Sequence, residues 1–254
     1  MTEGWVAVRV VTWNLWWRFG PWRERQKAIR SVLRELRPDL VGLQEVWAAD
    51  GENLAEWLAG ELGLHWTWAA SPAPERWRRR IGDAPVDIGA AVLSRWPVRT
   101  TEVLRLPAPP ELDDGRLALY ARTGPAHFFT AHLASAPAAS AVRRQQAAAL
   151  AEFAHRDGTV IVTGDFNAEP DSEELRLFRR HFRDAWPDSA APSATWDWHP
   201  ELPYTPDGPR QGARIDYVHL GGPGSVREVR RAGDRPVDGV WPSDHAAVVV
   251  DLVC

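Results

Sequence analysis

The chain has 254 residues, of which 44% are hydrophobic and 25% are charged, with a net charge of −4 at pH 7. A chain of this length buries enough surface to fold without disulfides, and its single cysteine, Cys254, excludes an intrachain disulfide. The acidic balance argues against a protein that coats nucleic acid through many phosphate contacts. It is compatible with an enzyme that touches only a few phosphates.

No run of about 18 apolar residues is present, so we expect no stable membrane insertion. Residues 1–11 lack the basic, apolar and small-residue regions of a secretory signal, and we expect a cytoplasmic protein. The 15 tryptophans and the predominance of arginine over lysine are interpreted as the codon bias of a GC-rich, bacterial genome.

Strands and helices alternate in the predicted order of elements. Apolar spacing predicts helices over residues 22–36 and 54–62, and an Ala- and Gln-rich stretch without breakers predicts a third over 139–154. Three Pro- and Gly-rich stretches, 71–85, 106–115 and 187–212, are interpreted as surface loops. The alternation indicates an α/β fold, and we expect one domain over residues 1–254. The predicted strands cover residues 8–12, 39–46, 88–93, 117–122, 127–132, 159–163, 215–220 and 246–252.

Polar residues follow several of these strands, in the segments TWNLWW, LQEVW, TAHLAS, TGDFNAEPDS and PSDHAAV. Each has an ordinary explanation when taken alone: an asparagine in a turn, a histidine in a core, or an acid that caps a helix. Their joint occurrence at strand ends favours a functional site, because burying so many polar groups costs stability. The residues are Asn14, Glu45, His132, Asp165, Asn167, Asp244 and His245, with Asp216 inside the strand RIDYVHL.

Hard oxygen ligands of this kind suit Mg²⁺ or Mn²⁺. We expect Glu45 to be the principal metal ligand, with Asn14 and Asp244 as helpers. His245 is the expected general base, and Asp216 is the carboxylate expected to fix its tautomer. Such a set predicts attack of activated water on a phosphate ester.

The ordered series TWN, LQE, HL, GDFN, RIDYV and SDH resembles the endonuclease/exonuclease/phosphatase superfamily, which includes deoxyribonuclease I. The resemblance implies a four-layered α/β sandwich, with two mixed β-sheets face to face and helices outside. It also implies that Asp165 and Asn167 position the attacking water and a phosphoryl oxygen. His132 would bind the phosphate or protonate the leaving group. Whether Asp165 or His245 is the base stays open.

The substrate is less constrained by the sequence. A nuclease or phosphodiesterase acting on DNA or RNA is the first interpretation. The alternatives are phospholipid or sphingomyelin hydrolysis, a small-metabolite phosphatase, and a non-catalytic binding module on the same scaffold; the retained polar residues argue against the last. We expect a monomer. Candidate substrate contacts are Arg95, Trp196, Trp198 and Trp241, together with a basic loop of Arg76, Arg78, Arg79 and Arg80 whose Trp77 could stack on a base. The alternatives are a surface salt bridge for Arg95, packing for the three tryptophans, and a solvated loop for the basic segment.

Overall fold

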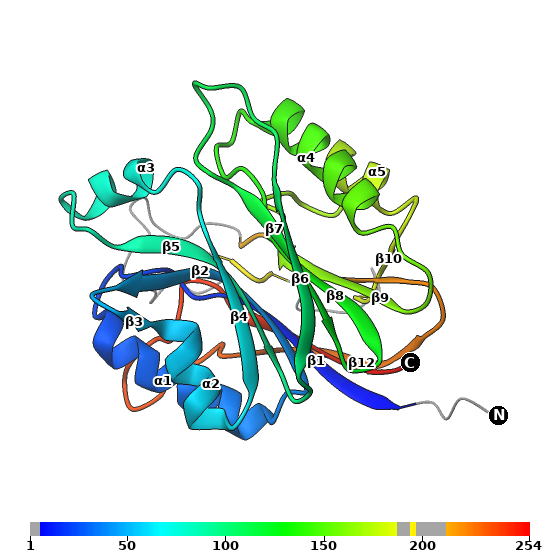
Figure 1. The fold of residues 1–254 in the computed structure, drawn as a ribbon, viewed down its shortest axis with the longest axis horizontal. Coiled ribbons are helices and arrows are strands. Elements are labelled where there is room, and N and C mark those ends of the chain that lie inside the picture. Colours follow the sequence, from blue (N-terminus) through cyan, green and yellow to red (C-terminus); the bar gives the residue numbers. More distant parts are fainter. Residues whose placement is uncertain (1–5, 187–193, 197–211) are drawn as a thin grey trace.

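The computed structural model describes residues 6–186, 194–196 and 212–254, which form two β-sheets packed face to face (Figure 1). The first sheet has seven strands in the order β12-β13-β1-β2-β5-β4, with the short β3 paired to β2. Most neighbours are antiparallel, but β1 and β2 are parallel, so the sheet is mixed. The strands are β1 (Ala7–Asn14), β2 (Leu40–Ala49), β3 (Glu52–Asn53), β4 (His65–Ala70), β5 (Asp87–Ser94), β12 (Ser225–Ala232) and β13 (Ala247–Val253).

The second sheet has six strands in the order β10-β11-β9-β8-β7-β6. It is also mixed, because β8 and β9 are parallel while the other pairs are antiparallel. Each sheet therefore contains one parallel pair, and both pairs lie in the middle of their sheets. The strands are β6 (Val98–Arg105), β7 (Leu117–Thr123), β8 (Ala126–His132), β9 (Val160–Asp165), β10 (Arg183–Asp184) and β11 (Asp216–Gly221).

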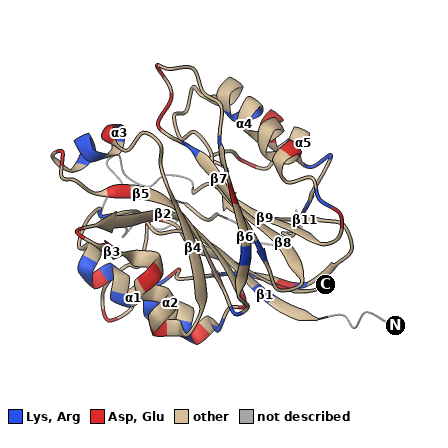
Figure 2. Ribbon diagram, in the orientation of Figure 1, with Lys and Arg blue, Asp and Glu red and all other residues tan. Residues whose placement is uncertain are grey.

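Helices cover the outer face of each sheet, which completes four layers (Figure 1). The seven-stranded sheet is covered by α1 (Trp22–Leu36) and α2 (Leu54–Leu62), and the six-stranded sheet by α4 (Ser140–Phe153) and α5 (Glu173–Phe178). Figure 2 shows charged residues concentrated on these peripheral helices and on the short α3 (Glu75–Arg78). The four-layered sandwich predicted from the sequence is confirmed.

The two sheets approach closely in the central core. Val10 and Val250 from one sheet and Phe128 from the other are fully buried between them. Gly42 of β2 has no room for a side chain, because a Cβ there would lie 2.1 Å from Thr163 Oγ1 of the opposite sheet. This contact fixes the distance between the parallel pairs, whose ends carry the polar residues of the candidate site.

The predicted helices over residues 22–36 and 54–62 have the bounds of α1 and α2. Strands β4, β6 and β12 were not expected from the sequence, and nearly all of their residues are exposed or half-buried. The stretch 71–85, expected to be a loop, contains α3 and a 3₁₀ turn at Arg79–Ile81. Among the described residues, no helix is long and apolar enough to span a membrane.

Candidate active site

The two parallel strand pairs end at the same edge of the sandwich and bring four predicted residues together. Asn14 ends β1 in register with Gln44, the residue before Glu45, and His132 ends β8 in register with Asp165 of β9. The carboxyl ends of parallel strands share one edge, where α/β folds place their sites. Side chains distant in the sequence thereby converge across both sheets.

Glu45 sits in a break of the β2 ladder. The pairing of β2 with β5 shifts register between Leu43 and Val46, and Glu45 adopts a left-handed φ of 52°. A non-glycine residue in this region costs on the order of 1 kcal/mol or more, and such strain clusters at functional sites. The bulge re-aims the Glu45 side chain toward Asn14, whose Nδ2 donates to Glu45 Oε1 at 3.2 Å. Glu45 Oε2 is buried and has no hydrogen-bond partner among the described residues.

Asp165 lies at the centre of the cluster and is 1% exposed. Its Oδ2 accepts from Asn14 Nδ2 at 3.0 Å and lies 3.3 Å from His132 Nε2 and 3.9 Å from His245 Nε2. Its Oδ1 accepts from the backbone N–H of Asn167 at 2.9 Å, which holds the turn after β9. One carboxylate oxygen therefore faces an amide and two imidazoles that come from three different segments.

Asp216 and His245 form a buried pair, with His245 Nδ1 2.9 Å from Asp216 Oδ2. This contact leaves His245 Nε2 directed toward Asp165. The pair is held by residues 194–196, since Thr195 Oγ1 accepts from the backbone N–H groups of Ile215 and Asp216, at 3.1 and 3.2 Å. The carbonyl of Thr195 accepts from Ala246 N at 2.7 Å, and residue 196 forms a β-bridge with His245.

The carboxylates control the protonation of the cluster. Burial alone would lower the pKa of His245, but Asp216, Asp244 and Asp165 raise it to about 10. Burial, and next the neighbouring Asp216, raise the pKa of Asp165 to about 7. Burial, with Arg116 as the next cause, holds the pKa of His132 well below its usual range, so that this imidazole is neutral. The cluster thus pairs a cationic histidine with a carboxyl that titrates near neutral pH.

The carboxylates of Glu45 and Asp244 are suited to bind a divalent cation. Burial raises the pKa of Asp244 to about 6, and the nearby Glu45 contributes to that rise. A cation between Glu45 and Asp244 would relieve this repulsion and satisfy the orphaned Glu45 Oε2. The amide oxygen of Asn14 accepts from the backbone N–H of Trp16 at 2.9 Å. Its Nδ2 is thereby oriented as the donor to the carboxylates of Glu45 and Asp165. A second candidate group, with ligand atoms within 4.8 Å of one another, is Asp165, Asp216 and His245.

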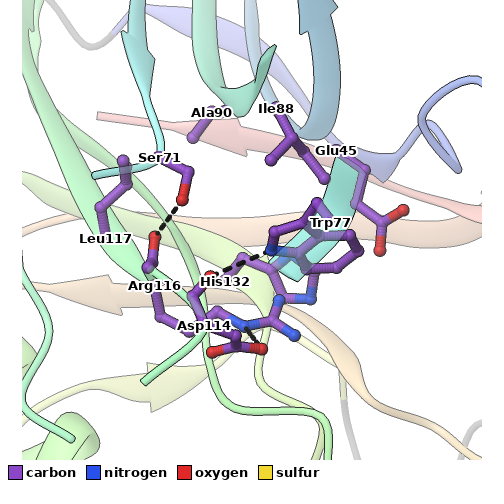
Figure 3. A pocket seen from close by; sticks show the side chains of 11 residues that line it. Glu45, Ser71, Trp77, Ile88, Ala90, Asp114, Arg116, Leu117 and His132 are labelled. Carbon is purple, nitrogen blue, oxygen red and sulfur yellow. Dashed lines mark hydrogen bonds and ion pairs between the residues drawn. The ribbon is translucent and has the colours of Figure 1, made fainter. Parts of the chain in front are cut away.

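A small cavity of about 30 Å³ lies beside Glu45 and His132 (Figure 3). Its floor is the buried Arg116, whose Nε is 2.7 Å from Asp114 Oδ2 and whose guanidinium lies 4.9 Å from the Trp77 ring centroid. The Nη1 of Arg116 is buried without a hydrogen-bond partner among the described residues. A space of this size holds about one water molecule or one polar substituent.

A larger groove of about 760 Å³ opens over the cluster. Aromatic and basic side chains form one part of its lining, namely Trp16, Phe19, Arg80 and Trp196. The Trp196 ring centroid is 6.4 Å from that of His245, so this predicted substrate contact lies at the site. Glu169, Asp171 and Glu173 form another part, and Arg143 pairs with the buried Glu174 at 2.9 Å.

Other predicted substrate contacts lie elsewhere. Arg95 follows β5 at the opposite edge of its sheet, where it pairs with Asp39 at 2.9 Å. Trp241 is half-buried and is not among the described residues that line the groove. Trp198 lies outside the described residues.

The basic loop differs from expectation. Trp77 is only 5% exposed and packs in the core, because its indole N–H donates to Asp114 O and its ring lies edge-on to Trp17. The expectation that Trp77 stacks on a base is wrong. Arg78 is paired with Asp87, whereas Arg80 lines the groove and stacks over Phe19 at 4.7 Å.

Several supporting residues were not singled out in the sequence, among them Arg25, Arg116, Thr195 and Ser243. Ser243 Oγ donates to Asn14 O at 2.7 Å and accepts from His245 N, which ties two site segments together. For Ser243 a signal existed, since it is part of the SDH block. Arg25, Arg116 and Thr195 act through partners that are distant in sequence, such as Pro242 O for Arg25 and Ser135 Oγ for Arg116, so no local pattern identifies them.

Several solved structures share the fold of this chain. Similar structures include an endonuclease/exonuclease/phosphatase from Beutenbergia cavernae DSM 12333 (23% identity, TM-score 0.75, covering 97% of this chain and 71% of that one). The human Nocturnin catalytic domain with bound sulfate is 20% identical (TM-score 0.73, 98% and 96%). D. rerio TDP2 complexed with single strand DNA product is 19% identical (TM-score 0.77, 97% and 98%). No curated protein matches the sequence.

These identities establish the fold alone, whereas the family follows from the sequence itself. The model of the Endonuclease/Exonuclease/phosphatase family matches residues 11–245, which include all the predicted catalytic and metal-binding residues. The resemblance seen in the ordered motifs is thereby confirmed. The chain belongs to the endonuclease/exonuclease/phosphatase family.

Proposed function

We propose that the protein is a Mg²⁺- or Mn²⁺-dependent phosphodiesterase that acts on nucleic acid, as a single-domain, monomeric, cytoplasmic enzyme. The observation that carries the proposal is the line of buried groups from Asp216 through His245 to Asp165, beside the carboxylates of Glu45 and Asp244. The family, whose members are in general phosphoric ester hydrolases, supports the reaction class.

Glu45 and Asp244 hold the cation, and Asn14 orients Glu45 and Asp165 through its amide donors. When bound, the cation neutralises charge on the phosphate and makes water a better nucleophile. Asn14 thus links the metal ligands to the groups that handle the proton.

Asp165 takes the proton of the attacking water, since the pKa of about 7 that burial gives it matches this task. His245, held as a cation chiefly by Asp216, donates from Nε2 to a phosphate oxygen and stabilises the charge that develops there. As the water oxygen bonds to phosphorus, the ester P–O bond breaks, and the leaving oxygen takes its proton from His245 Nε2. His132 is neutral, and Asn167 donates its Nδ2 to Leu133 O at 3.0 Å, which leaves its amide oxygen to orient the water. We therefore propose Asp165 rather than His245 as the base.

Nucleic acid is the proposed substrate because the groove is large and carries aromatic rings next to the site. Trp16, Phe19 and Trp196 offer faces on which a base or sugar packs, and Arg80 offers a cation for a flanking phosphate. The similar structure of D. rerio TDP2, complexed with single strand DNA product, supports this choice.

A small phosphorylated metabolite is the second candidate. The exposed Glu169, Asp171 and Glu173 on the groove lining repel a long polyanion, whereas a short substrate avoids them. Under this alternative the protein cleaves a mononucleotide or sugar phosphate and leaves DNA intact.

The test measures hydrolysis of bis-p-nitrophenyl phosphate and of single-stranded and plasmid DNA, with Mg²⁺, Mn²⁺ or EDTA. We expect metal-dependent turnover of all three, lost in Glu45→Gln and kept in Glu102→Gln, an exposed glutamate on β6. Hydrolysis of the small ester without cleavage of DNA would favour the metabolite alternative. Equal turnover in EDTA would contradict the metal-dependent mechanism.

The pH profile tests the choice of base. With Asp165 as the base and His245 as the cation, kcat rises with pH through about 7 and falls as pH passes about 10. Asp165→Asn should abolish turnover at every pH. An Asp165→Asn enzyme that keeps the acidic limb of the profile would return the role of base to His245.

A further inference from the structure

Arg25 is a buried arginine whose donors all converge on backbone carbonyls at the active-site edge. It lies in the first turns of α1 and is 1% exposed. Its Nε donates to Phe19 O at 3.0 Å, its Nη1 to Leu15 O at 2.8 Å and Pro242 O at 2.9 Å, and its Nη2 to the carbonyls of residues 16 and 17, each at 2.9 Å. A guanidinium has five N–H donors in a fixed planar array, and five carbonyls meet it here.

The loop that Arg25 holds is strained. Trp16 and Trp17 are consecutive non-glycine residues with left-handed φ angles of 56° and 39°. This conformation turns the carbonyls of residues 15–17 toward one point, at a cost on the order of 1 kcal/mol or more for each residue. The Arg25 guanidinium at that point offsets the cost, because five buried or partly buried carbonyls would otherwise lack these donors. The loop conformation therefore depends on Arg25.

The same loop carries the metal-site geometry. The backbone N–H groups of Leu15 and Trp17 donate to the carbonyls of Gln44 and Glu45, at 2.9 and 3.1 Å, which supports the bulge that aims Glu45. The N–H of Trp16 donates to Asn14 Oδ1 and orients that amide. A displaced loop would change the directions of Glu45 and Asn14 together.

The fifth carbonyl, that of Pro242, belongs to the turn that carries Asp244. Arg25 thereby joins the loop beside Glu45 to the segment of the other proposed metal ligand. Ser243 also joins the segment of Asp244 to the end of β1, because its Oγ donates to Asn14 O at 2.7 Å. A third connection is the indole N–H of Trp13, which donates to His245 O at 2.9 Å. Of these connections Arg25 makes the largest number of hydrogen bonds and is the one that also holds the loop beside Glu45.

We propose that Arg25 is the positioning residue of the metal site and fixes the separation of Glu45 and Asp244 through the backbone without touching the ion. The inference rests on the proposed function, because it presupposes that these two carboxylates bind a divalent cation. Lysine keeps the charge of Arg25 but has three donors instead of five, so at least two of the carbonyls lose their partner in Arg25→Lys.

The experiment titrates Mn²⁺ into wild-type protein and Arg25→Lys, and follows binding by calorimetry and by the Mn²⁺ electron paramagnetic resonance signal. Supporting groups of metal ligands typically change affinity by 10- to 100-fold, and we expect Arg25→Lys to weaken Mn²⁺ binding at least about tenfold. Circular dichroism and a cooperative melt above the assay temperature establish that the variant is folded.

Arg143→Lys is the matched control. Arg143 is also buried, at 6% exposed, and donates to the carbonyls of Ala134 and Ala136 and to Glu174. None of these groups belongs to Glu45, Asp244 or their loops. We expect Arg143→Lys to lose stability while its Mn²⁺ affinity stays within twofold of wild type. An equal loss of affinity in both variants would overturn the proposal, because it would indicate general loosening.

Ser243→Ala tests the same connection with Arg25 intact, and it decides the question if Arg25→Lys does not fold. It removes the bond to Asn14 O and should weaken Mn²⁺ binding severalfold, less than Arg25→Lys does. If Arg25→Lys folds and binds Mn²⁺ as tightly as wild type, the positioning role is overturned. If Arg25→Lys does not fold, unchanged Mn²⁺ affinity in Ser243→Ala overturns it instead. Either result leaves the proposed function intact. Wild-type protein that binds no Mn²⁺ would overturn both.

Discussion

Two buried histidines of this protein have opposite protonation. His245 is 5% exposed and lies beside three aspartates, whose charges outweigh burial and raise its pKa to about 10. His219 of β11 is fully buried, and burial lowers its pKa to about 4. Its ring lies among aromatic rings, and its two nitrogens have no hydrogen-bond partner among the described residues. The ring centroids of Phe166, Phe178 and Tyr217 lie 5.2, 5.0 and 5.3 Å away.

The difference shows that burial alone does not identify a catalytic histidine. Asp216 and His219 are on the same strand, three residues apart, yet the Asp216 side chain lies in the site while His219 packs against Phe178 of α5. What separates the two histidines is the balance of charge: three aspartates raise the pKa of His245, whereas the effect of Asp184 on His219 is opposed by two arginines. His245 also lines the groove. The environment of each imidazole therefore assigns its role, and changing that environment tests the assignment.

Among the changes that test this comparison, Asp216→Asn should have the largest effect, because it removes the hydrogen-bonded partner that keeps His245 charged. We expect kcat to fall by about 10² to 10⁴, the range of a general acid–base contribution. The pKa of His245, followed by NMR, should fall below its wild-type value of about 10. His219 provides an internal control in the same spectra, since its pKa should not change. An Asp216→Asn enzyme with half the wild-type kcat would contradict the role of the pair.

His219→Leu should change the acid stability of the protein and leave turnover intact. Below about pH 6.5 the unfolded chain binds a proton at His219, whereas the folded protein does so only near pH 4. Stability is therefore lost as pH falls through this window, by about 3 kcal/mol at roughly 1.4 kcal/mol per pKa unit.

Urea unfolding of wild type and His219→Leu at pH 7 and pH 4.5 measures this loss. Titration of the buried carboxyls that do not interact with His219 is common to both proteins and cancels in the comparison, so the measured difference reports His219 together with its neighbour Asp184. We expect wild type to lose about 2–3 kcal/mol more than the variant between the two pH values. An equal loss would show that His219 is not held neutral by burial.

Thr195→Val tests the hydrogen bonds that place Asp216 against His245. Valine matches the shape of threonine but leaves the N–H groups of Ile215 and Asp216 without the Thr195 acceptor. The expected cost is about 1–3 kcal/mol of stability, with a roughly tenfold fall in kcat. Thr101→Val, at an exposed position of β6, is the control and should stay within about 0.5 kcal/mol of wild type. Unchanged kcat in Thr195→Val would assign Thr195 a purely structural role.

The sequence predicts much of the fold because its signals are local. The apolar spacing of α1 and α2 and the residues that follow them, Pro38 and Gly63, mark these helices within one segment. The edge strands β6 and β12 lack that signal, since their side chains are exposed or half-buried and their polar residues resemble those of loops. Their strand character comes from pairing with β7 and β13.

The same difference between local and non-local signals applies to the candidate site. The polar residues at strand ends were placed together because parallel strands share an edge, a rule that depends only on order. The burial of Trp77 and the five carbonyls around Arg25 depend on segments that are distant in sequence, such as residues 114 and 242. The pKa of His245 is equally non-local, since Asp165, Asp216 and Asp244 come from three segments.

Arg95→Ala should have the smallest effect on activity. It tests whether the edge of the sandwich away from the site contributes to substrate binding. Arg95 is paired with Asp39 at the edge away from the site, and its side chain is 53% exposed, so its loss should cost at most about 1 kcal/mol. We expect kcat/KM to remain within twofold of wild type. Arg80→Ala is the matched variant inside the groove, and it should raise KM because Arg80 faces the substrate there. A tenfold rise in KM for Arg95→Ala would show that the sequence-based assignment of Arg95 to the substrate was right, and that the substrate extends to the far edge.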